Sequence, residues 1–586
     1  MHNEANDFFP APGTPKIYAY ADSRYPDCLK VGYTSKSVSE RVEAQYPVKL
    51  PNQSYTILLD EVAMREDGSF FTDHDVHRVL ARQQVRRDNG EWFVCDIAAV
   101  QAAILEVKIG RINQDRRTLN FGMRPEQQAA VDKARQYFDS YSAENPDKTP
   151  HFLWNAKMRF GKTFAAYQLA KKMGWSKILI LTFKPAVQNA WAEDLANHLD
   201  FEGWQFIVRD GLAFGDADTD KPIVCFGSFQ DYLGKNSAGG IKAKNEWVHT
   251  TNWDCVVFDE YHYGAWRTNA KDLFEAEDKN EIGFAEGEGI AYFEEGNMPI
   301  TTRAYLYLSG TPFRAIASGE FIEEQIYNWT YSDEQRAKEN WPTVQINPYA
   351  ALPRMVMLTY QLPPAIRDVA LKGEFDEFDL NEFFKADGED IVAKFKYENE
   401  VQKWLDLIRG AMLETTVDNL KLGAEKPPMP FADVRLLHVL SHTFWFLPSV
   451  AACHAMGNLL AQRQNKFYHD YSVVVAAGSD AGIGVAALPP VKKALGNGLN
   501  TKSITLSCGK LTTGVSVAPW TGILMLRNVT SPETYFQGAF RVQTPWVVRG
   551  HDANDPNNEL IVKNECYVFD FAPDRRLQLS PECERI

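Results

Sequence analysis

The chain has 586 residues, of which 45% are hydrophobic and 24% charged, and its formal net charge is −15. This length exceeds what one hydrophobic core supports, so roughly two to four domains are expected. The negative charge excludes a protein that holds nucleic acid by overall positive charge, so any basic surface must be local. Without a long apolar run or a secretory leader, the chain is predicted to be cytoplasmic and outside membranes. The 8 cysteines form no CxxC pair, which indicates reduced thiols.

Residues 1–118 are predicted to form a small α+β domain. Two short strands, KIYAY and CLKVGYT, precede a charged helix with the sequence TDHDVHRVLARQQVRR and the segment GEWFV. The polar segment KIGRINQDRRTLN is typical of a connector to the next domain.

Residues 119–345 are predicted to form the first of two α/β lobes. A turn or a helical stretch follows each of its apolar runs, which are FLWNA, KILILTF, PIVCFGS, CVVFDE and AYLYLSG. Continuous apolar strands of this kind are typical of a parallel sheet that is covered on both faces.

Residues 346–586 repeat the pattern and are predicted to form the second lobe. Its predicted strands are LLHVLSHT, YSVVVAAGS, SITLSC, GILMLRNV and CYVFDFA. The charged, helix-rich stretch at about 362–428 is predicted to be an insertion on this sheet. The acidic segment AEDKNEIGFAEGEGIAYFEEGN in the first lobe is predicted to be a solvated loop, or alternatively a negative rim that guides DNA. The short sequence after the last strand is consistent with an absent C-terminal region.

The segment FLWNAKMRFGKT predicts a phosphate site built from a strand, a loop and a helix start. Backbone N–H groups and the helix dipole hold phosphates in such a loop. Lys162 would reach the β- and γ-phosphates, and the Thr163 hydroxyl would bind Mg²⁺. Ala156 stands where the pattern GxxxxGK[ST] has its first glycine, so the pattern alone could be a chance match. The residues predicted to contact the nucleotide here are Ala156, Lys157, Met158, Arg159, Phe160, Gly161, Lys162 and Thr163.

A second acidic element supports this site. The apolar strand in CVVFDEYH ends at Asp259 and Glu260. Asp259 is placed to bind Mg²⁺ through water, and Glu260 to orient and deprotonate an attacking water. The alternative is a solvated strand end without chemistry.

Together these elements resemble superfamily 2 helicases. AKMRFGKT resembles motif I, and DEYH resembles the DEAD/DEAH-type box of motif II. RPEQQAA, with Gln127, resembles the adenine-reading segment, and Ser309-Gly310-Thr311-Pro312 resembles motif III. LILTFKPAVQNAW and FGSFQ resemble motifs Ia and Ib. The resemblance, over about 119–575, implies two tandem RecA-like lobes that hydrolyse ATP with Mg²⁺.

The second lobe continues the resemblance with HVLSHTFW as motif IV, LTTGVSVAPW as motif V and YFQGAFRVQ as motif VI. The resemblance implies that Arg541 is an arginine finger and that Gln537 contacts the same phosphate region. Thr544 stands where the family often has a second arginine. The alternative for Arg541 is a surface salt bridge.

The first domain resembles the GIY-YIG nuclease fold over about 16–96. Ile17-Tyr18 corresponds to the first triad, Val31-Gly32 to the end of the second, and EWF follows. Lys30 stands where the second triad usually has tyrosine. It would replace the tyrosine's phosphate contact, or it would mark a domain that binds DNA without cutting it.

The nuclease resemblance implies four site residues. Tyr18 or His77 would activate water, Arg41 would stabilise the phosphate, and Glu91 would bind one divalent metal. The structural alternatives are a core aromatic for Tyr18, a helix-surface residue for His77 and a strand-start carboxylate for Glu91.

These features predict an ATP-dependent DNA helicase or translocase coupled to DNA cleavage, related to restriction or to phage. Its partner would be DNA, in double-stranded form, with possible further restriction or modification subunits, because no NPPY-type methyltransferase motif is visible. Two alternatives stay open. One is a remodelling motor whose first domain only binds DNA, and the other is an RNA helicase.

Overall fold

A computed structural model describes residues 14–46, 54–113, 115–182, 187–209, 211–229, 232, 245–259, 300–310, 321–360, 379–410, 429–478, 487–509, 511, 515–529, 532–549 and 559–572. The chain divides into two compact units. The N-terminal unit comprises 1–123, 190–204 and 547–562, and the second unit comprises the rest. The domain limits at 118 and 345 stay predictions. No helix of the described ranges is long and apolar enough to cross a membrane.

The N-terminal unit contains an antiparallel sheet in the order β3-β1-β2-β5-β4. Its strands are β1 (Lys16–Asp22), β2 (Cys28–Thr34), β3 (Tyr55–Val62), β4 (Arg87–Asn89) and β5 (Trp92–Val94). Its helices are α1 (Val38–Glu43), α2 (Asp73–Arg82) and α3 (Ile97–Ile109). The predicted helix over 72–87 was wrong at its end, because Gln84 takes a φ of 60° and turns the chain into β4.

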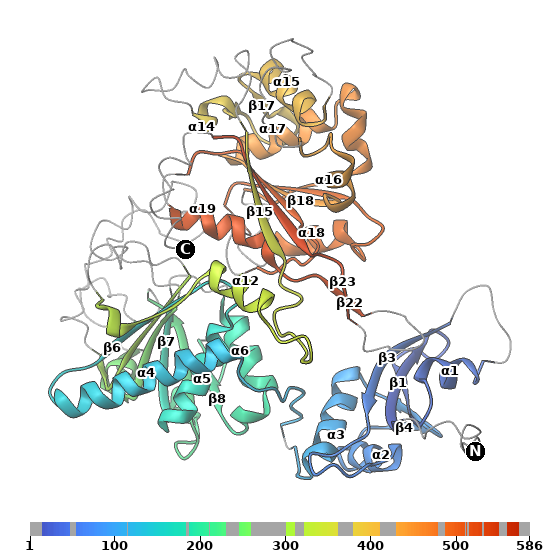
Figure 1. Cartoon of the computed structure of the whole chain (residues 1–586), viewed down its shortest axis with the longest axis vertical. Coiled ribbons are helices and arrows are strands. Elements are labelled where there is room, and N and C mark those ends of the chain that lie inside the picture. Colours follow the sequence, from blue (N-terminus) through green and yellow to red (C-terminus); the bar gives the residue numbers. More distant parts are fainter. Residues whose placement is uncertain are drawn as a thin grey trace, which may run out of the picture. The chain divides into compact units, whose positions relative to one another are not determined.

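The two faces of this sheet bury different residues because side chains alternate along a strand. Ile17 and Ala19 share a core with residues of α2 and α3. Tyr18 and Tyr20 point to the opposite face and pack with Val38 and Val42 of α1. Figure 1 shows α2 and α3 together at one side of the sheet and α1 at the other.

The second unit contains two parallel sheets, which confirms the predicted α/β fold with two parallel-sheet lobes. The first sheet has the order β14-β6-β13-β11-β7-β9-β8. Its strands are β6 (His151–Ala156), β7 (Lys177–Thr182), β8 (Gln205–Ile207), β9 (Ile223–Ser228), β11 (Cys255–Asp259), β13 (Tyr305–Ser309) and β14 (Ile326–Trp329). All five predicted strands of this lobe are present. The long helices α4 (Pro125–Glu144) and α5 (Lys162–Met173) lie side by side on it (Figure 1).

Shorter elements complete this lobe. They are α8 (Glu246–Thr250), α12 (Tyr331–Glu339) and the small parallel pair β10 (Asn252–Trp253) and β12 (Thr301–Thr302). Most of α6 (Gln188–Asn197) belongs to the N-terminal unit. The acidic segment at 276–297 lies outside the described residues.

The second sheet has the order β15-β24-β21-β18-β20-β19 and is also parallel. Its strands are β15 (Arg354–Thr359), β18 (His442–Phe446), β19 (Ser472–Val475), β20 (Ser503–Ser507), β21 (Gly522–Met525) and β24 (Glu565–Asp570). Its helices are α16 (Val434–Val439), α17 (Val450–Leu460), α18 (Leu488–Leu495) and α19 (Pro532–Ala539). A short antiparallel pair, β22 (Val547–Arg549) and β23 (Glu559–Ile561), falls in the N-terminal unit.

The predicted strand LLHVLSHT was wrong over its first half, because its first four residues belong to α16 and the strand begins only at His442. The Asp433 side chain accepts a hydrogen bond from the Arg435 N–H and so caps the helix start. This cap stabilises the start of the six-residue helix α16, in a segment whose apolar residues alone had indicated a strand.

The predicted insertion is described over 379–410. It contains α14 (Leu380–Phe383), α15 (Glu398–Ile408) and the two-stranded pair β16 (Ala386–Asp387) and β17 (Lys394–Phe395). Trp404 of α15 is fully buried, and its ring lies 5.9 Å from the ring of Trp445 in β18. The described part of the insertion therefore shares the hydrophobic core of the second sheet.

A glycine in the N-terminal sheet is required by close packing. Gly32 lies opposite Tyr18, and a Cβ at position 32 would lie 2.5 Å from the Tyr18 hydroxyl oxygen. We expect Gly32→Ala to displace the tyrosine ring and to lower the local free energy of opening of β1 and β2 by about 1–3 kcal/mol. Hydrogen–deuterium exchange of peptides from these strands measures that change.

Gly122→Ala is the matched control, because a Cβ there would meet nothing within 4 Å. Equal exchange in the two variants would contradict the packing argument.

Candidate functional site

The predicted phosphate loop runs from the end of β6 to the start of α5. Ala156, where the simple motif has glycine, is the last residue of β6 and is fully buried. Because its backbone is extended, a residue with a Cβ is accommodated there. The left-handed turn falls later, at Arg159 with a φ of 73° and at Gly161 with a φ of 79°. The Lys162 ammonium donates to the carbonyl oxygens of Ala156 at 2.7 Å and Lys157 at 3.4 Å. The loop therefore curves around the lysine head group at the start of α5.

The start of α4 holds this loop. The Gln127 side-chain amide donates to Phe160 O at 2.8 Å, and its oxygen accepts from the Arg124 N–H at 2.9 Å. A Cβ at Gly161 would lie 2.5 Å from the Gln127 amide nitrogen, so both φ and packing require glycine there. Arg124 also donates to Phe160 O at 2.6 Å. Gln127 therefore lies against the loop, and its contact with adenine stays a prediction.

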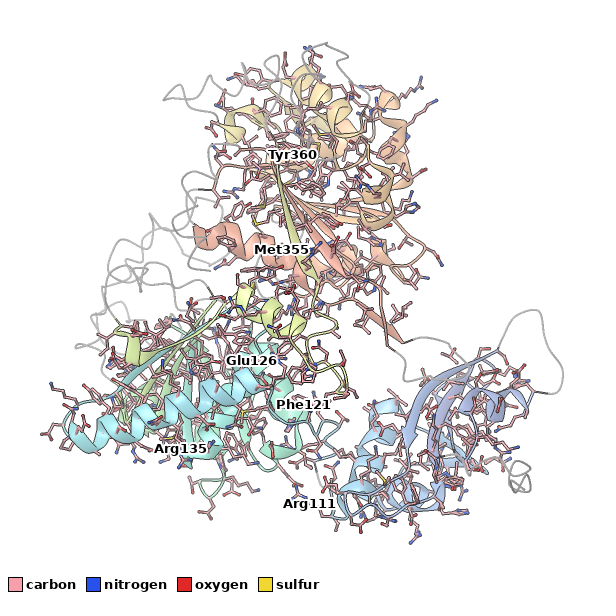
Figure 2. The ribbon with its side chains drawn as sticks, viewed as in Figure 1. Arg111, Phe121, Glu126, Arg135, Met355 and Tyr360 are labelled. Carbon is pink, nitrogen blue, oxygen red and sulfur yellow. The ribbon has the colours of Figure 1, made fainter. Side chains whose placement is uncertain are left out.

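Arg124 is itself anchored by a buried carboxylate. Its Nε donates to Glu126 at 2.5 Å, and the Tyr349 hydroxyl donates to the same side chain. Figure 2 shows Glu126 at the start of α4. The carboxylate, 3% exposed, therefore fixes the arginine that bonds the loop.

Lys157 does not present its ammonium to the inside of the loop. Its side chain is 2% exposed and pairs at 2.5 Å with Glu334 of α12, whose side chain is also 2% exposed. Burial lowers the pKa of Lys157, and the Glu334 charge opposes that shift. Only the Lys157 backbone is therefore available to a bound phosphate.

The carboxyl ends of neighbouring strands bring the other predicted residues to the same edge. Asp259, the last residue of β11, lies opposite Leu308 of β13, and Ser309 lies opposite Asn155 of β6. A Cβ at Gly310 would lie 3.7 Å from Lys162 Nζ, which shows how closely the motif III segment approaches the loop. Glu260, Thr311 and Pro312 lie outside the described residues and stay predictions.

The donors predicted for Mg²⁺ fit a hard cation. Thr163, the second residue of α5, offers a hydroxyl, and Asp259 offers a carboxylate at 7% exposure. Oxygen ligands of this kind are those that Mg²⁺ prefers. Across the described ranges, no group of three or more His, Cys, Asp or Glu side chains is arranged to hold a metal.

Arg541 lies in a short 3₁₀ turn, Phe540–Gln543, directly after α19. It is 3% exposed, which excludes the alternative of a surface salt bridge. Its guanidinium donates to Val515 O at 2.6 Å and to Gln537 O at 3.2 Å, and it lies 3.5 Å from the sulfur of Met158 in the phosphate loop. The predicted arginine finger and the predicted loop therefore meet within the second unit.

Another arginine links the same two regions. Arg159 donates to Ser516 Oγ at 2.7 Å and to Thr544 Oγ1 at 2.6 Å. Thr544 is the position where the helicase family often has a second arginine. Here a guanidinium reaches that position from the phosphate loop.

The N-terminal unit gathers a second set of predicted residues on the Tyr18 face of its sheet. Gln45 connects them: its amide nitrogen donates to the Tyr18 hydroxyl at 3.0 Å, and its oxygen accepts from Lys30 at 2.5 Å and from Tyr20 at 2.9 Å. Lys30 also pairs with Glu91 at 3.4 Å. Lys30 therefore lies between the amide and the predicted metal-binding carboxylate.

The electrostatics of Tyr18 show that two further charges are close. Burial raises the pKa of Tyr18 above 10.0, the hydrogen bond from Gln45 lowers it, the Glu91 charge raises it, and Arg41 lowers it. The residue is fully enclosed. The structure thus brings Tyr18, Arg41 and Glu91 together, with the phenol in its protonated form at neutral pH.

His77 has a different environment. It is 6% exposed rather than on the helix surface, and its Nε2 lies 2.8 Å from Val31 O, which requires Nε2 to be the donor. Burial lowers the pKa of His77, so the ring is neutral at pH 7. Its Nδ1 has no hydrogen-bond partner in the described part of the chain. His77 joins α2 to β2.

Sequence reasoning missed Gln45, Arg124 and Glu334. Gln45 follows Arg41 by four residues, a spacing that places both on one side of a helical turn and could have identified it. Arg124 lies three residues before Gln127, at the cap of α4. Glu334 is separated from Lys157 by 177 positions, and no sequence signal connects them.

Comparison with known proteins gives one family and one curated relative. Residues 16–108 match the T5orf172 domain family. A protein of Mycoplasma pneumoniae, the C-terminus of the putative type II restriction enzyme and methyltransferase RM.MpnORF110P, is 30% identical over 498 residues. The match covers 78% of this chain and 65% of the relative, so the chain spans slightly less than two thirds of that protein.

Two solved structures are similar at low identity. The ATP-dependent type ISP restriction-modification enzyme LlaBIII bound to DNA is 11% identical with a TM-score of 0.43, over 79% of this chain and 29% of that one. A fragment of a putative HsdR subunit of a type I restriction enzyme from Vibrio vulnificus YJ016 is 14% identical with a TM-score of 0.40, over 88% and 73%. Similarities this weak assign no activity.

The buried pair beside the phosphate loop generates a stability prediction. Glu334→Leu leaves the Lys157 ammonium buried without its carboxylate, and we expect a loss of about 3–5 kcal/mol in the free energy of unfolding of that region. Calorimetry without nucleotide measures the loss as a lower melting temperature. The double variant Lys157→Met/Glu334→Leu removes both charges and should recover most of the loss. Equal melting temperatures for the single and double variants would contradict the role given to the pair.

Proposed function

We propose that the chain is an ATP-driven DNA motor, a helicase or translocase, coupled to metal-dependent DNA cleavage by its N-terminal unit. The observation that supports the motor is the edge of the first sheet, where Lys162, Asp259 and the Ser309-Gly310 segment follow adjacent parallel strands. The setting we propose is restriction or a phage-related process. The name of the Mycoplasma pneumoniae relative, a putative restriction enzyme and methyltransferase, supports it.

In the proposed motor, residues of both lobes act on the phosphates of ATP. Lys162 would turn from its two carbonyl acceptors to the β- and γ-phosphates, because a phosphate oxygen is the stronger acceptor for an ammonium. Thr163 and Asp259 would hold Mg²⁺, which would supply charge neutralisation at these phosphates. Glu260 would orient the attacking water.

Arg541 would stabilise the charge that develops on the γ-phosphate, and such arginines contribute about 10³–10⁵-fold to the rate. Gln537, one helical turn earlier, would contact the same region. The contact of Arg541 with Met158 supports this proposal, because it places the guanidinium beside the phosphate loop.

In the proposed nuclease, Tyr18 is a better candidate than His77 for a place beside the attacking water, where its protonated phenol would position that water by a hydrogen bond. The Tyr18 hydroxyl lies with Arg41 and Glu91, whereas His77 is used between α2 and β2. Arg41 and Lys30 would stabilise the charge of the scissile phosphate. Glu91 would bind one divalent metal, which would neutralise further charge there.

A second candidate for this unit is DNA binding without cleavage. Tyr18 is fully enclosed, and Lys30 pairs with the carboxylate that would bind the metal. Both features favour a closed site that needs rearrangement before it could cut. A nuclease assay with Mg²⁺ or Mn²⁺ on supercoiled, nicked and single-stranded DNA separates the two candidates.

The ATPase prediction concerns Lys162. Lys162→Ala removes the ammonium that would bind the β- and γ-phosphates, and we expect at least about a 100-fold loss of DNA-stimulated ATP hydrolysis. Phosphate release measured with duplex DNA and with RNA at matched salt also identifies the stimulating nucleic acid.

The control is Lys172→Ala on the same helix, because Lys172 pairs with Asp132 at the protein surface. It should keep normal hydrolysis. A Lys162→Ala protein that hydrolyses ATP normally would show that the site lies elsewhere.

The nuclease prediction concerns Glu91. Glu91→Gln removes the negative charge that would bind the metal, so Mg²⁺-dependent nicking of plasmid DNA should be lost while ATP hydrolysis stays unchanged. Gel analysis of supercoiled DNA and phosphate release, in the same reaction, measure both.

Glu61→Gln is a close control, because Glu61 and Glu91 side chains are each 36% exposed and each pairs with a lysine. A wild-type protein that cuts none of the tested DNA forms with either metal would favour the binding-only candidate.

A further inference from the structure

A buried lysine outside the predicted site residues lies beside the segments that carry Arg541. Lys563 lies two residues before the start of β24 and is 2% exposed. Its ammonium donates to three backbone carbonyl oxygens, those of Ala518 at 2.7 Å, Trp520 at 2.8 Å and Val542 at 2.9 Å. An ammonium has three N–H donors, so each donor has an acceptor.

These acceptors belong to the two segments that hold Arg541. Val542 is the next residue after Arg541 in the 3₁₀ turn. Ala518 and Trp520 follow Val515, whose carbonyl oxygen accepts from the Arg541 guanidinium at 2.6 Å. Lys563 therefore bonds to the chain on both sides of the contact that orients Arg541.

Stability alone does not require a buried ammonium at position 563. Taking an ammonium out of water is unfavourable, and an apolar side chain of similar volume is often as stable or more stable in such a position. Burial lowers the pKa of Lys563 to about 7. The Cys566 thiol opposes this shift, and the Arg159 charge adds to it. The three carbonyl oxygens would be left buried without a donor if the ammonium were removed.

We propose that Lys563 is a positioning residue for Arg541, which draws the 515–520 segment and the 540–543 turn together so that the guanidinium faces the phosphate loop. The proposal rests on the proposed ATPase function. It predicts that Lys563 acts on hydrolysis only through Arg541 and has little effect on nucleotide binding.

The test is a double-mutant cycle in the full chain. Lys563→Met keeps the length of the side chain and removes the donors, and we expect kcat for ATP to fall by about 10–100-fold, less than for loss of the arginine itself. KM for ATP should change by less than about threefold, because transition-state stabilisation is lost while ground-state binding is kept. Adding Lys563→Met to Arg541→Ala should then have no further effect on kcat.

Lys133→Met is the control for losing a lysine that bonds a carbonyl, since Lys133 donates to Ile326 O at 2.7 Å in the first lobe. Melting temperatures of all variants check folding. If Lys563→Met does not fold, Lys563→Gln, which keeps two N–H donors without the charge, replaces it in the same cycle.

The outcomes separate the two proposals. A wild-type protein without ATPase activity would overturn the proposed function, and this inference with it. Two outcomes with an active wild type would overturn the inference alone. One is an unchanged kcat in Lys563→Met. The other is that Lys563→Met lowers kcat by the same factor in the wild type and in Arg541→Ala.

Discussion

Parallel pairing of β6, β13 and β11 is the constraint on which the candidate nucleotide site depends. With Ser309 opposite Asn155 and Asp259 opposite Leu308, these strands end at one edge of the sheet. The chain leaves each strand at that edge, so the phosphate loop, the acidic strand end and the Ser309-Gly310 segment meet there. A slip of one residue in this register would turn Asp259 to the other face.

Around the candidate site, buried or partly buried cations are matched by oxygen atoms from other segments of the chain. Lys157 is paired with Glu334, Arg159 with two hydroxyl groups, and Lys563 with three carbonyl groups. An unmatched buried charge would be strongly destabilising. The shape of the loop therefore depends on α12 and on the segments around Arg541.

The N-terminal unit uses a comparable arrangement on a smaller scale. Strand alternation places Tyr18 on the face opposite to Ile17, and the missing side chain of Gly32 leaves room for the phenol. Gln45 then connects that phenol to Lys30, and Lys30 forms an ion pair with Glu91. Cleavage and binding place different demands on this network: cleavage requires access to the Tyr18 oxygen, whereas binding requires only the cations.

The sequence by itself determined the parallel α/β lobes, because long apolar runs indicate strands that are buried on both faces. It also indicated that Asp259 ends one such strand and that Gly161-Lys162-Thr163 lies where the loop after another strand meets a helix. It could not place the strand at 442–446, where the cap at Asp433 formed a helix from an apolar run. It also gave no sign of Glu334 or Lys563. Their partners are distant along the chain, and only tertiary packing decided which buried charge met which oxygen.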